Sequence, residues 1–296
     1  MRLRFEMRYC SYRPASPLDE FVDFFWMIAG GGMDRRERIL PSGTSELVIN
    51  LREDEIRIYD SIQTERYRRL SGAVLSGTYS GVFVCDATQH QSMLGVHFRP
   101  GGAFPFVGVS AAELTDAHVN LEDLWGSSTR LLQERLLAAA TTRERFQLLE
   151  ESLLERLRRF QRRHYAIGVA LRRLALISGG SLTRDLAQEV GLSQRRFIQL
   201  FATHVGLTPK LLHRILRFQH ARALAEAAER SSRTRPERQS LHGAIDWAEI
   251  AITCGYYDQS HFVNDFQSLS GLSPAEYIRQ LRPARNLKEN HLPVLG

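Results

Sequence analysis

The chain has 296 residues, of which 43% are hydrophobic and 24% are charged, a composition typical of a folded protein with roughly two domains. It has no apolar run of the ~20 residues that a membrane-spanning helix needs, and its start, MRLRFEMRYC, lacks the apolar core of a secretion signal. Its three cysteines, Cys10, Cys85 and Cys254, fit neither a disulfide framework nor a CxxC site. We therefore expect a cytoplasmic protein without a membrane partner.

Charge is distributed unevenly along the chain. Residues 1–160 carry 20 Lys and Arg against 22 Asp and Glu, whereas residues 161–296 carry 19 against 11, a net charge of +8. A basic half joined to a slightly acidic half is typical of a polyanion-binding module attached to another domain. A solvated basic face gives the same count, so motifs must decide between the two interpretations.

Residues 1–128 are predicted to form a mostly-β domain of short strands. Arg52-Glu53-Asp54 separates SELVINL (45–51) from EIRIYD (55–60), two segments rich in apolar and β-branched residues, and predicts a hairpin. Several strands at this spacing predict a small barrel or sandwich. The strand candidates are FVDFFWMIAG (21–30, with a short helix as the alternative), SELVINL (45–51), EIRIYD (55–60), AVLSGTY (73–79), VFVCDA (82–87) and SMLGVHF (92–98).

Residues 129–163 show a helical period instead. Thr141 and Glu144 fit a capping box, which predicts two helices that meet there. Apolar residues at spacings of three and four form one stripe, which suits an interdomain connector, a dimer seam or packing against the β domain. The stripe comprises Leu131, Leu132, Leu136, Leu137, Phe146, Leu149, Leu153 and Leu157.

The last third contains an internal repeat. GLSQRRFIQLFATHVGLTP (191–209) aligns with GYYDQSHFVNDFQSLSGLSP (255–274), so that Phe197 and Phe201 match Phe262 and Phe266 at an offset of 65. Two copies of one supersecondary unit are therefore present. The segment SSRTRPERQSLHG (231–243) between them is polar and contains proline, and it is expected to be an exposed loop.

Each copy is predicted to be a helix, a tight glycine turn and a second helix. Gly191 and Gly255 supply the positive φ that ends the first helix, and Ser193 and Asp258 cap the second. The phenylalanines, at i and i+4, bury one face of that second helix. Its other face is polar and comprises Gln194, Arg195, Arg196 and Gln199 in the first copy and Gln259, Ser260, His261 and Asn264 in the second.

These polar helices suit the major groove of DNA. Arg hydrogen-bonds guanine, and Gln or Asn hydrogen-bonds adenine, in a bidentate manner. One long helix is predicted from Pro209 to Glu226, with Thr208 as its cap, and it can hold the two units about 34 Å apart, one turn of B-DNA. Phosphate contacts are expected from the helix start and the basic face of the long helix, at Gln194, Lys210, Arg214 and Arg217.

At this point the sequence resembles a known family. DLAQEVGLSQRRFIQLFATHVGLTPK (185–210) and DWAEIAITCGYYDQSHFVNDFQSLSGLSPAEY (246–277) resemble the DNA-binding domain of the AraC/XylS transcription regulators. The resemblance implies a seven-helix fold that binds duplex promoter DNA. It implies base reading by Arg195, Arg196, Gln199, Gln259, Ser260, His261 and Asn264. Ile198 departs from the pattern, because an apolar side chain reads only a thymine methyl.

The amino-terminal half is similar to an uncharacterised sensor-like domain, on the segments YRPASPLDEFVDFFW (12–26), ILPSGTSELVIN (39–50) and GVHFRPGGAFPFVGV (95–109). The family implies a ligand-sensing or dimerising role, in some members on a cupin-like barrel, and RNA polymerase as a partner if the regulator activates. The ligand is unknown, and a small-molecule effector and a homodimer both stay open. Trp26 with Phe24 and Phe25 fits either an apolar ligand pocket or plain core packing.

Other chemistry is not expected. His90 and His97 are seven residues apart and lack the HxH and Glu of a cupin metal site, and the glycine clusters lack P-loop or GxGxxG frames. We expect no metal, no cofactor and no catalytic residue. The alternative is a DNA-modifying or repair enzyme with an appended AraC-type module, although Cys10 and Cys85 lack a Pro-Cys-His context.

The sequence thus predicts an α+β multidomain protein that acts as a sequence-specific transcription regulator. Its expected parts are a mostly-β sensor domain (1–128), a helical connector (129–163), an all-α DNA-binding domain with two helix-turn-helix units joined by a long helix (164–284) and a loose tail (285–296).

Overall fold

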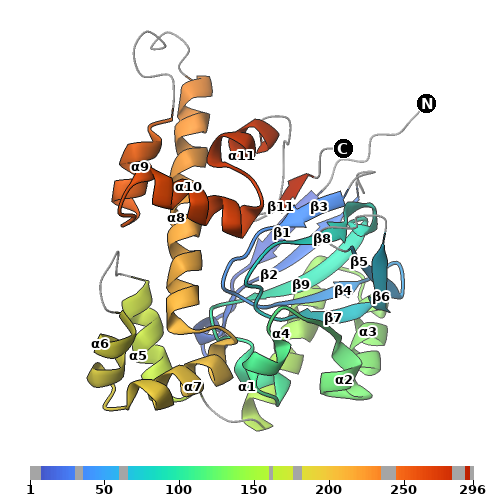
Figure 1. Cartoon of the computed structure of the whole chain (residues 1–296). Coiled ribbons are helices and arrows are strands. Elements are labelled where there is room, and N and C mark those ends of the chain that lie inside the picture. Colours follow the sequence, from blue (N-terminus) through green and yellow to red (C-terminus); the bar gives the residue numbers. More distant parts are fainter. Residues whose placement is uncertain are drawn as a thin grey trace, which may run out of the picture.

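The structure, a computed structural model, describes residues 8–30, 36–59, 66–159, 163–175, 182–234, 245–281 and 291–293. Two parts lie side by side in Figure 1. One part holds the sheets, with short helices beneath them, and the other is helical and is built around one long helix, α8. The mostly-β first half and the helical second half agree with the predicted fold class.

Six antiparallel strands form the first sheet, in the order β1-β2-β9-β4-β7-β10. The strands are β1 (Arg8–Tyr12), β2 (Val22–Ala29), β9 (Ser92–Phe98), β4 (Glu46–Asn50), β7 (Ala73–Ser76) and β10 (His118–Asn120). The segment 21–30 is therefore a strand, as its bulky apolar residues predicted. Phe25, Leu47 and Leu94 on this sheet are fully buried in the larger core of the amino-terminal half.

Five strands form the second sheet, in the order β11-β3-β8-β5-β6. They are β3 (Arg36–Ile39), β5 (Glu55–Tyr59), β6 (Tyr67–Ser71), β8 (Phe83–Asp86) and β11 (His291–Pro293), and each neighbouring pair is antiparallel. Trp26, Ile28, Val74 and Met93 of the first sheet share a buried cluster with Ile56 of the second. The two sheets therefore pack face to face as a sandwich.

Two sequence predictions are wrong here. The hairpin across Arg52-Glu53-Asp54 does not form, because β4 and β5 belong to different sheets. Asn50 redirects the chain: its Oδ1 accepts hydrogen bonds from the amides of Arg52 (3.0 Å) and Glu53 (3.1 Å), and its Nδ2 donates to the Glu55 carbonyl (3.1 Å). The tail is not loose at 291–293, because β11 pairs with β3.

Helices cover the outer face of the first sheet. Thr141 and Glu144 form the predicted capping box between α3 (Ser128–Ala138) and α4 (Thr142–Arg159). Most of the apolar stripe packs into the core with Leu47, so of the three interpretations it is packing against the β domain that the structure shows. Leu131 and Leu137 are exposed. The shorter elements are η1 (Leu18–Glu20), η2 (Ala87–Gln89), α1 (Phe104–Val107), η3 (Ala111–Leu114) and α2 (Leu121–Trp125).

The helical part begins with α5 (Tyr165–Leu174). It continues with α6 (Leu182–Glu189), α7 (Gln194–Val205), α8 (Pro209–Thr234), α9 (Trp247–Thr253), α10 (Gln259–Ser270) and α11 (Pro274–Leu281). α8 extends past the predicted end at Glu226, so residues 231–234 of the expected loop are helical; residues 235–243 lie outside the described residues. None of the helices in the described part of the chain combines the length and apolar character that a bilayer crossing requires.

Candidate nucleic-acid interface

The first helix-turn-helix unit consists of α6 and α7. Gly191 turns the chain with φ +69°, and the amide of Leu192 donates to the Ala187 carbonyl at 2.9 Å. Ser193 then caps α7, its Oγ accepting from the Arg196 amide at 3.3 Å. Phe197 and Phe201 are fully buried. The local design matches the sequence prediction, and it fixes one face of α7 inside the domain.

The second unit, α9 and α10, repeats this design. Asp246 accepts a hydrogen bond from the Glu249 amide at 2.9 Å, which caps α9, and Gly255 turns the chain with φ +73°. Asp258 caps α10 by accepting from the His261 amide at 2.7 Å. The phenylalanines of α10, at the positions equivalent to those of α7, are also fully buried.

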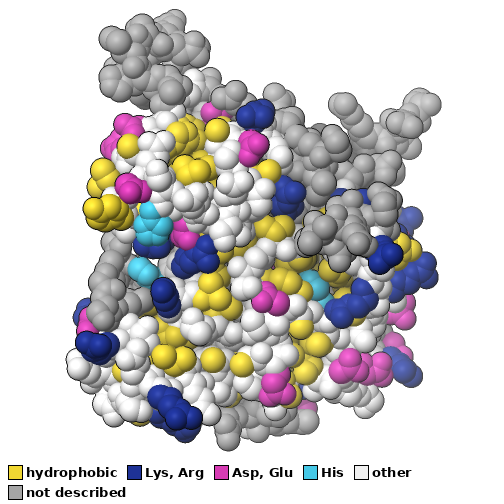
Figure 2. Space-filling model, in the orientation of Figure 1, with side chains coloured by type: hydrophobic (Ala, Val, Ile, Leu, Met, Phe, Trp, Pro, Cys, Tyr) yellow, Lys and Arg dark blue, Asp and Glu magenta, His cyan; other side chains and the backbone are white. Residues whose placement is uncertain are grey.

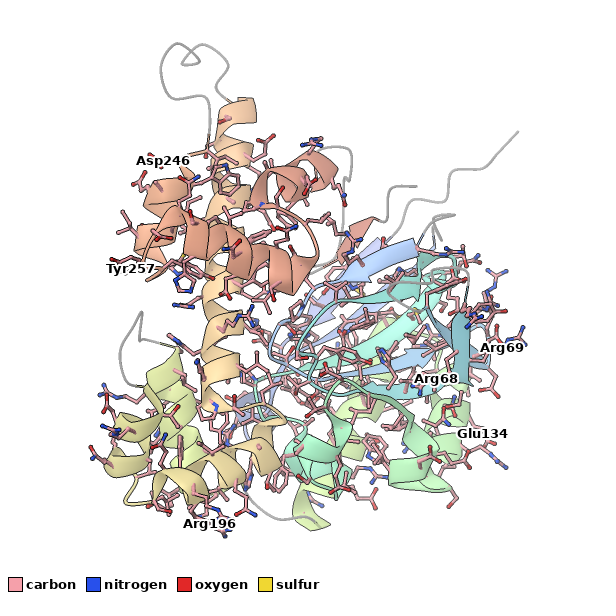
Figure 3. All side chains as sticks on the ribbon, viewed as in Figure 1. Arg68, Arg69, Glu134, Arg196, Asp246 and Tyr257 are labelled. Carbon is pink, nitrogen blue, oxygen red and sulfur yellow. The ribbon has the colours of Figure 1, made fainter. Side chains whose placement is uncertain are left out.

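The side chains predicted to read bases all lie on the open faces of these two helices. Arg195, Arg196 and Gln199 on α7 are exposed, and Figure 3 shows Arg196 at the outer edge of that helix. Ile198, the departure from the family pattern, is half-buried beside them. On α10 the exposed residues are Gln259, Ser260, His261 and Asn264. Contact with bases stays a prediction, but the faces are accessible to DNA.

The four residues predicted to contact phosphate divide into two pairs. Gln194 and Lys210 are exposed. Arg214 and Arg217 instead form ion pairs with Asp265 of α10, which is 8% exposed. Any phosphate contact by these two arginines has to compete with that carboxylate, so their first role in this fold is to attach α10 to α8.

Asp265 is a structural residue that the sequence prediction missed. Arg217 is held further, because it donates to the Gly255 carbonyl at 3.2 Å and lies 4.4 Å from the centre of the Tyr256 ring. The repeat carried a signal for this cluster, since the position equivalent to Asp265 in the first unit is the apolar Leu200. An acidic residue at an inward position predicts a buried partner.

α8 connects the two units. Its 26 residues span about 39 Å at 1.5 Å per residue. Ile215 and Phe218 are fully buried in a core shared with the phenylalanines of both units. Figure 1 shows α8 running past α7 at one end and α10 near its middle, and Figure 2 shows basic and His side chains on this side of the molecule. One rigid helix therefore sets the relative position of the two units.

The helical part also contacts the β domain. Thr78 Oγ1 donates to the Val205 carbonyl at 2.9 Å, and Thr115 Oγ1 donates to the Gly206 carbonyl at 2.5 Å, both at the end of α7. His204 lies against Phe104, with ring centres 4.0 Å apart. Burial, with His164 and Arg163 nearby, lowers the pKa of His204 to about 4, so this contact is made by a neutral imidazole.

The β domain offers little for metal or thiol chemistry. No group of three or more His, Cys, Asp or Glu in the described residues is arranged to hold a metal ion. His97 faces Glu46 at 3.7 Å and His90 faces Glu37 at 3.7 Å, each within the protein. Burial raises the pKa of Cys10 in the β domain and raises that of Cys254 in the helical part to about 11, the opposite of what an activated nucleophile needs.

Comparison with known proteins agrees with this division of the chain. Residues 186–280 match the family described as a helix-turn-helix domain, and residues 10–120 match a domain of unknown function (DUF6597). No curated protein matches.

Among solved structures, the chain is similar to ToxT from Vibrio cholerae strain SCE256 with an unsaturated fatty acid bound, with 11% identity, a TM-score of 0.43 and coverage of 97% of this chain and 99% of that one. ToxT from Vibrio cholerae O395 bound to (E)-4-(8-methylnaphthalen-1-yl)but-3-enoic acid gives 9% identity, a TM-score of 0.45 and coverage of 93% and 98%.

The repeated units at 191–209 and 255–274 lie within the matched helix-turn-helix domain, where each forms the turn and the capped second helix that the sequence predicted. The matched helix-turn-helix domain, which follows a domain of unknown function, agrees with the resemblance of residues 185–210 and 246–277 to the DNA-binding domain of the AraC/XylS transcription regulators.

Proposed function

We propose that the chain binds a specific duplex DNA element by placing α7 and α10 in successive major grooves. The observation that carries the proposal is the duplication: two capped helices bury equivalent phenylalanines and expose seven polar side chains of the types that read base edges. Because α8 joins both units in one chain, a single copy supplies the two contacts that simpler helix-turn-helix proteins obtain by dimerising.

The two units are expected to read half-sites about one helical turn apart on the same face of the duplex. Arg195, Arg196 and Gln199 belong to one half-site, and Gln259, Ser260, His261 and Asn264 to the other. Gln194 and Lys210, both exposed, are expected to contact phosphate. Arg214 and Arg217 are expected to contribute only if phosphate displaces them from Asp265.

The amino-terminal domain is proposed to sense a small molecule and to act on the DNA-binding units through its contacts with α7 and α8. Thr78 and Thr115 hold the end of α7, and Gln219 Nε2 of α8 donates to the Pro41 carbonyl at 2.6 Å. A change of shape in the sheets therefore has a direct route to both recognition helices. No observation favours the repair-enzyme alternative.

The test begins with selection of bound duplexes from a random pool by the full chain. The affinities of Arg195→Ala and Arg196→Ala for the selected duplex are then measured. If the replaced residue reads a base, the variant is expected to lose about 1–3 kcal/mol of binding free energy and its preference at one base pair. Lys210→Ala is expected to weaken binding to all duplex sequences nearly equally. It should also lower the slope of log affinity against log salt concentration by about one. Arg172→Ala, which removes an exposed charge from α5, is the matched control.

The half-site geometry has its own test. Insertion of five base pairs between the two halves of the selected element turns one half to the opposite face, and affinity should fall to that of a single half-site. Asn264→Ala should weaken recognition of only one half-site, the one whose recognition Arg195→Ala leaves unchanged. Wild-type affinity of Arg195→Ala and Arg196→Ala at every salt concentration, or indifference to the insertion, would contradict the proposal.

A further inference from the structure

A cavity lies between the two sheets of the amino-terminal domain. Its empty volume is about 560 Å³, part of which is space open to solvent. We call it the inter-sheet cavity. Both sheets contribute to its mostly apolar wall, through Trp26, Val48, Ile56, Ile58, Val74 and Met93.

His118 presents a buried polar atom at the wall of the cavity. His118 on β10 is 4% exposed; its Nδ1 lies 2.8 Å from Ser76 Oγ, but its Nε2 is buried and has no hydrogen-bond partner among the described residues. The rings of Tyr79 and Phe83 enclose the imidazole at centre distances of 4.8 and 4.6 Å. A buried nitrogen in this condition costs free energy that a ligand's hydrogen bond would recover.

The ligand group that suits this nitrogen is a hydroxyl. Burial, with Arg68 nearby, lowers the pKa of His118 to about 3, so the imidazole is neutral at pH 7. Its Nε2 is then a donor or an acceptor, depending on how the proton is shared with Ser76. A hydroxyl can accept or donate and therefore fits both tautomers.

Charged side chains around the inter-sheet cavity are paired within the protein. Arg57 donates to Asp86 at 3.2 Å. Glu37, which is 3% exposed, lies 2.7 Å from His291 Nδ1, and Glu46 lies 3.7 Å from His97. A ligand with a formal charge would have to break one of these pairs or enter an apolar site unpaired, so an uncharged ligand is favoured.

The carboxyl-terminal strand β11 forms one side of the inter-sheet cavity. In the register with β3, His291 lies opposite Ile39, and both line the cavity. Side chains alternate along a strand, so Leu292 points the other way, and it is fully buried with Leu40 in the core of the helical part. β11 thus contacts the cavity on one face and the DNA-binding domain on the other.

A second cavity adjoins the first, and one of its lining residues is hydrogen-bonded to α8. The two share a boundary made by Ile39, Glu46, Ser76, Phe83 and His291. Pro41 and Ser42 line the second cavity, and the Pro41 carbonyl accepts the hydrogen bond from Gln219 of α8. The neighbouring Gly43 lies so close to α8 that an added Cβ would meet Leu212 Cδ1 at 2.5 Å.

We propose that the inter-sheet cavity binds a small uncharged phenol-type molecule, with its ring among the apolar side chains and its hydroxyl on His118 Nε2. β11 closes this site, and through β11 the bound molecule biases the position of the second helix-turn-helix unit. The inference rests on the proposed function only for its effect on DNA; binding of the small molecule stands independently of it.

Calorimetry on the full chain tests the site with 4-propylphenol, and propylbenzene serves as the matched ligand without a hydroxyl. Wild type is expected to bind the phenol about 5–10-fold more tightly, the value of one hydrogen bond to a buried group. His118→Phe should erase this preference, and Val74→Trp, which fills the cavity, should abolish binding of both ligands. Leu137→Trp, in a separate groove, is the control and should bind as wild type does.

The role of β11 is tested by the chain ending at residue 290 and by the milder His291→Ala. Both should weaken 4-propylphenol binding by at least threefold. Saturating 4-propylphenol should change the affinity of wild type for its selected duplex by at least threefold, and that change should vanish in the shortened chain. Circular dichroism confirms that each variant is folded.

Equal binding of the two ligands by wild type, or unchanged binding by Val74→Trp, would overturn the site. If the chain still binds DNA sequence-selectively in that case, the proposed regulator function is unaffected. If the chain binds the phenol but does not bind DNA sequence-selectively, the regulator function is refuted and the ligand site remains supported. An effect on DNA that persists without residues 291–296 would refute the role of β11.

Discussion

In the first helix-turn-helix unit, the turn that follows the recognition helix is buried against the amino-terminal domain, whereas in the second unit the equivalent turn is open. Gly206 ends α7 and its carbonyl accepts from Thr115. Gly271 ends α10 at the same place in the repeat, and a Cβ added there would meet nothing within 4 Å. The same local fold therefore serves as a docking point in one copy and as free surface in the other.

The second unit is attached in a different way. Asp265 ties α10 to α8 through Arg214 and Arg217, and β11, whose Leu292 is buried in the core of the helical part, contacts α11. The position equivalent to Asp265 in the first unit is Leu200, so this ionic attachment belongs to the second unit alone. The two copies therefore share the helix-turn-helix geometry itself, while the contacts that orient each unit differ.

The largest expected effect comes from removing Asp265. Asp265→Ala leaves the Arg217 side chain, which is 17% exposed, without its carboxylate, and loss of one partner of a buried pair costs about 3 kcal/mol. Urea unfolding should show this loss, and DNA binding should fall mainly at the second half-site. Asp246→Ala, which removes only a helix cap, is the comparison and should cost about 1 kcal/mol. A loss no larger than that of Asp246→Ala would show that the ion pairs do not orient the unit.

Next in size is the difference between Gly206→Ala and Gly271→Ala. Both glycines have positive φ, +86° and +73°, so each alanine pays about 1–2 kcal/mol of backbone strain. Only at residue 206 does the new Cβ also press on the β domain, at 3.0 Å from the Ala111 carbonyl oxygen and 3.2 Å from Thr115 Oγ1. Gly206→Ala should therefore lower the melting temperature further. Protease cleavage between the two parts should rise for Gly206→Ala alone.

A smaller effect is expected at the caps, where the two units are alike. Ser193→Ala and Asp258→Ala each remove one hydrogen bond to a helix start and should each cost about 1 kcal/mol. Each should weaken DNA binding only through its own half-site. Thermal melts and half-site competition measure these outcomes, and a cap variant that disturbed both half-sites would show that the units do not act separately.

Local features of the helical domain were predictable because they depend on neighbouring residues. The caps, the glycine turns and the buried phenylalanines follow from spacing within twenty residues, and each copy of the repeat supported the other. The strands around Leu47 and Leu94 were predictable for the same reason. Exposure of the side chains that are proposed to read bases followed from the helical period.

Features that depend on distant segments were not predictable from the sequence. β4 and β5 are adjacent in the chain and rich in strand formers, yet Asn50 sends them to different sheets. β11 is three residues long and pairs with a strand more than 250 residues earlier, for which no local pattern exists. Likewise, Asp265 could be predicted as the partner of Arg217 only by knowing which face of α10 contacts α8.

The last expected difference between the two units is a pH dependence at the end of α7, which has no effect at neutral pH. His204 has a pKa of about 4 in the folded chain against about 6.5 when unfolded, so the unfolded state binds more protons between these values. The stabilising contribution of the neutral imidazole is therefore complete above pH 6.5 and declines as the pH falls toward 4. His204→Gln should flatten this part of the dependence, as measured by melting temperatures from pH 4 to 7. His118, buried in the β domain with a pKa of about 3, still contributes in the same direction, so the slope should diminish without vanishing. Because the equivalent residue in the second unit is Leu269, the acid-sensitive step is expected to release the end of α7 from Phe104 and leave the attachment of α10 intact.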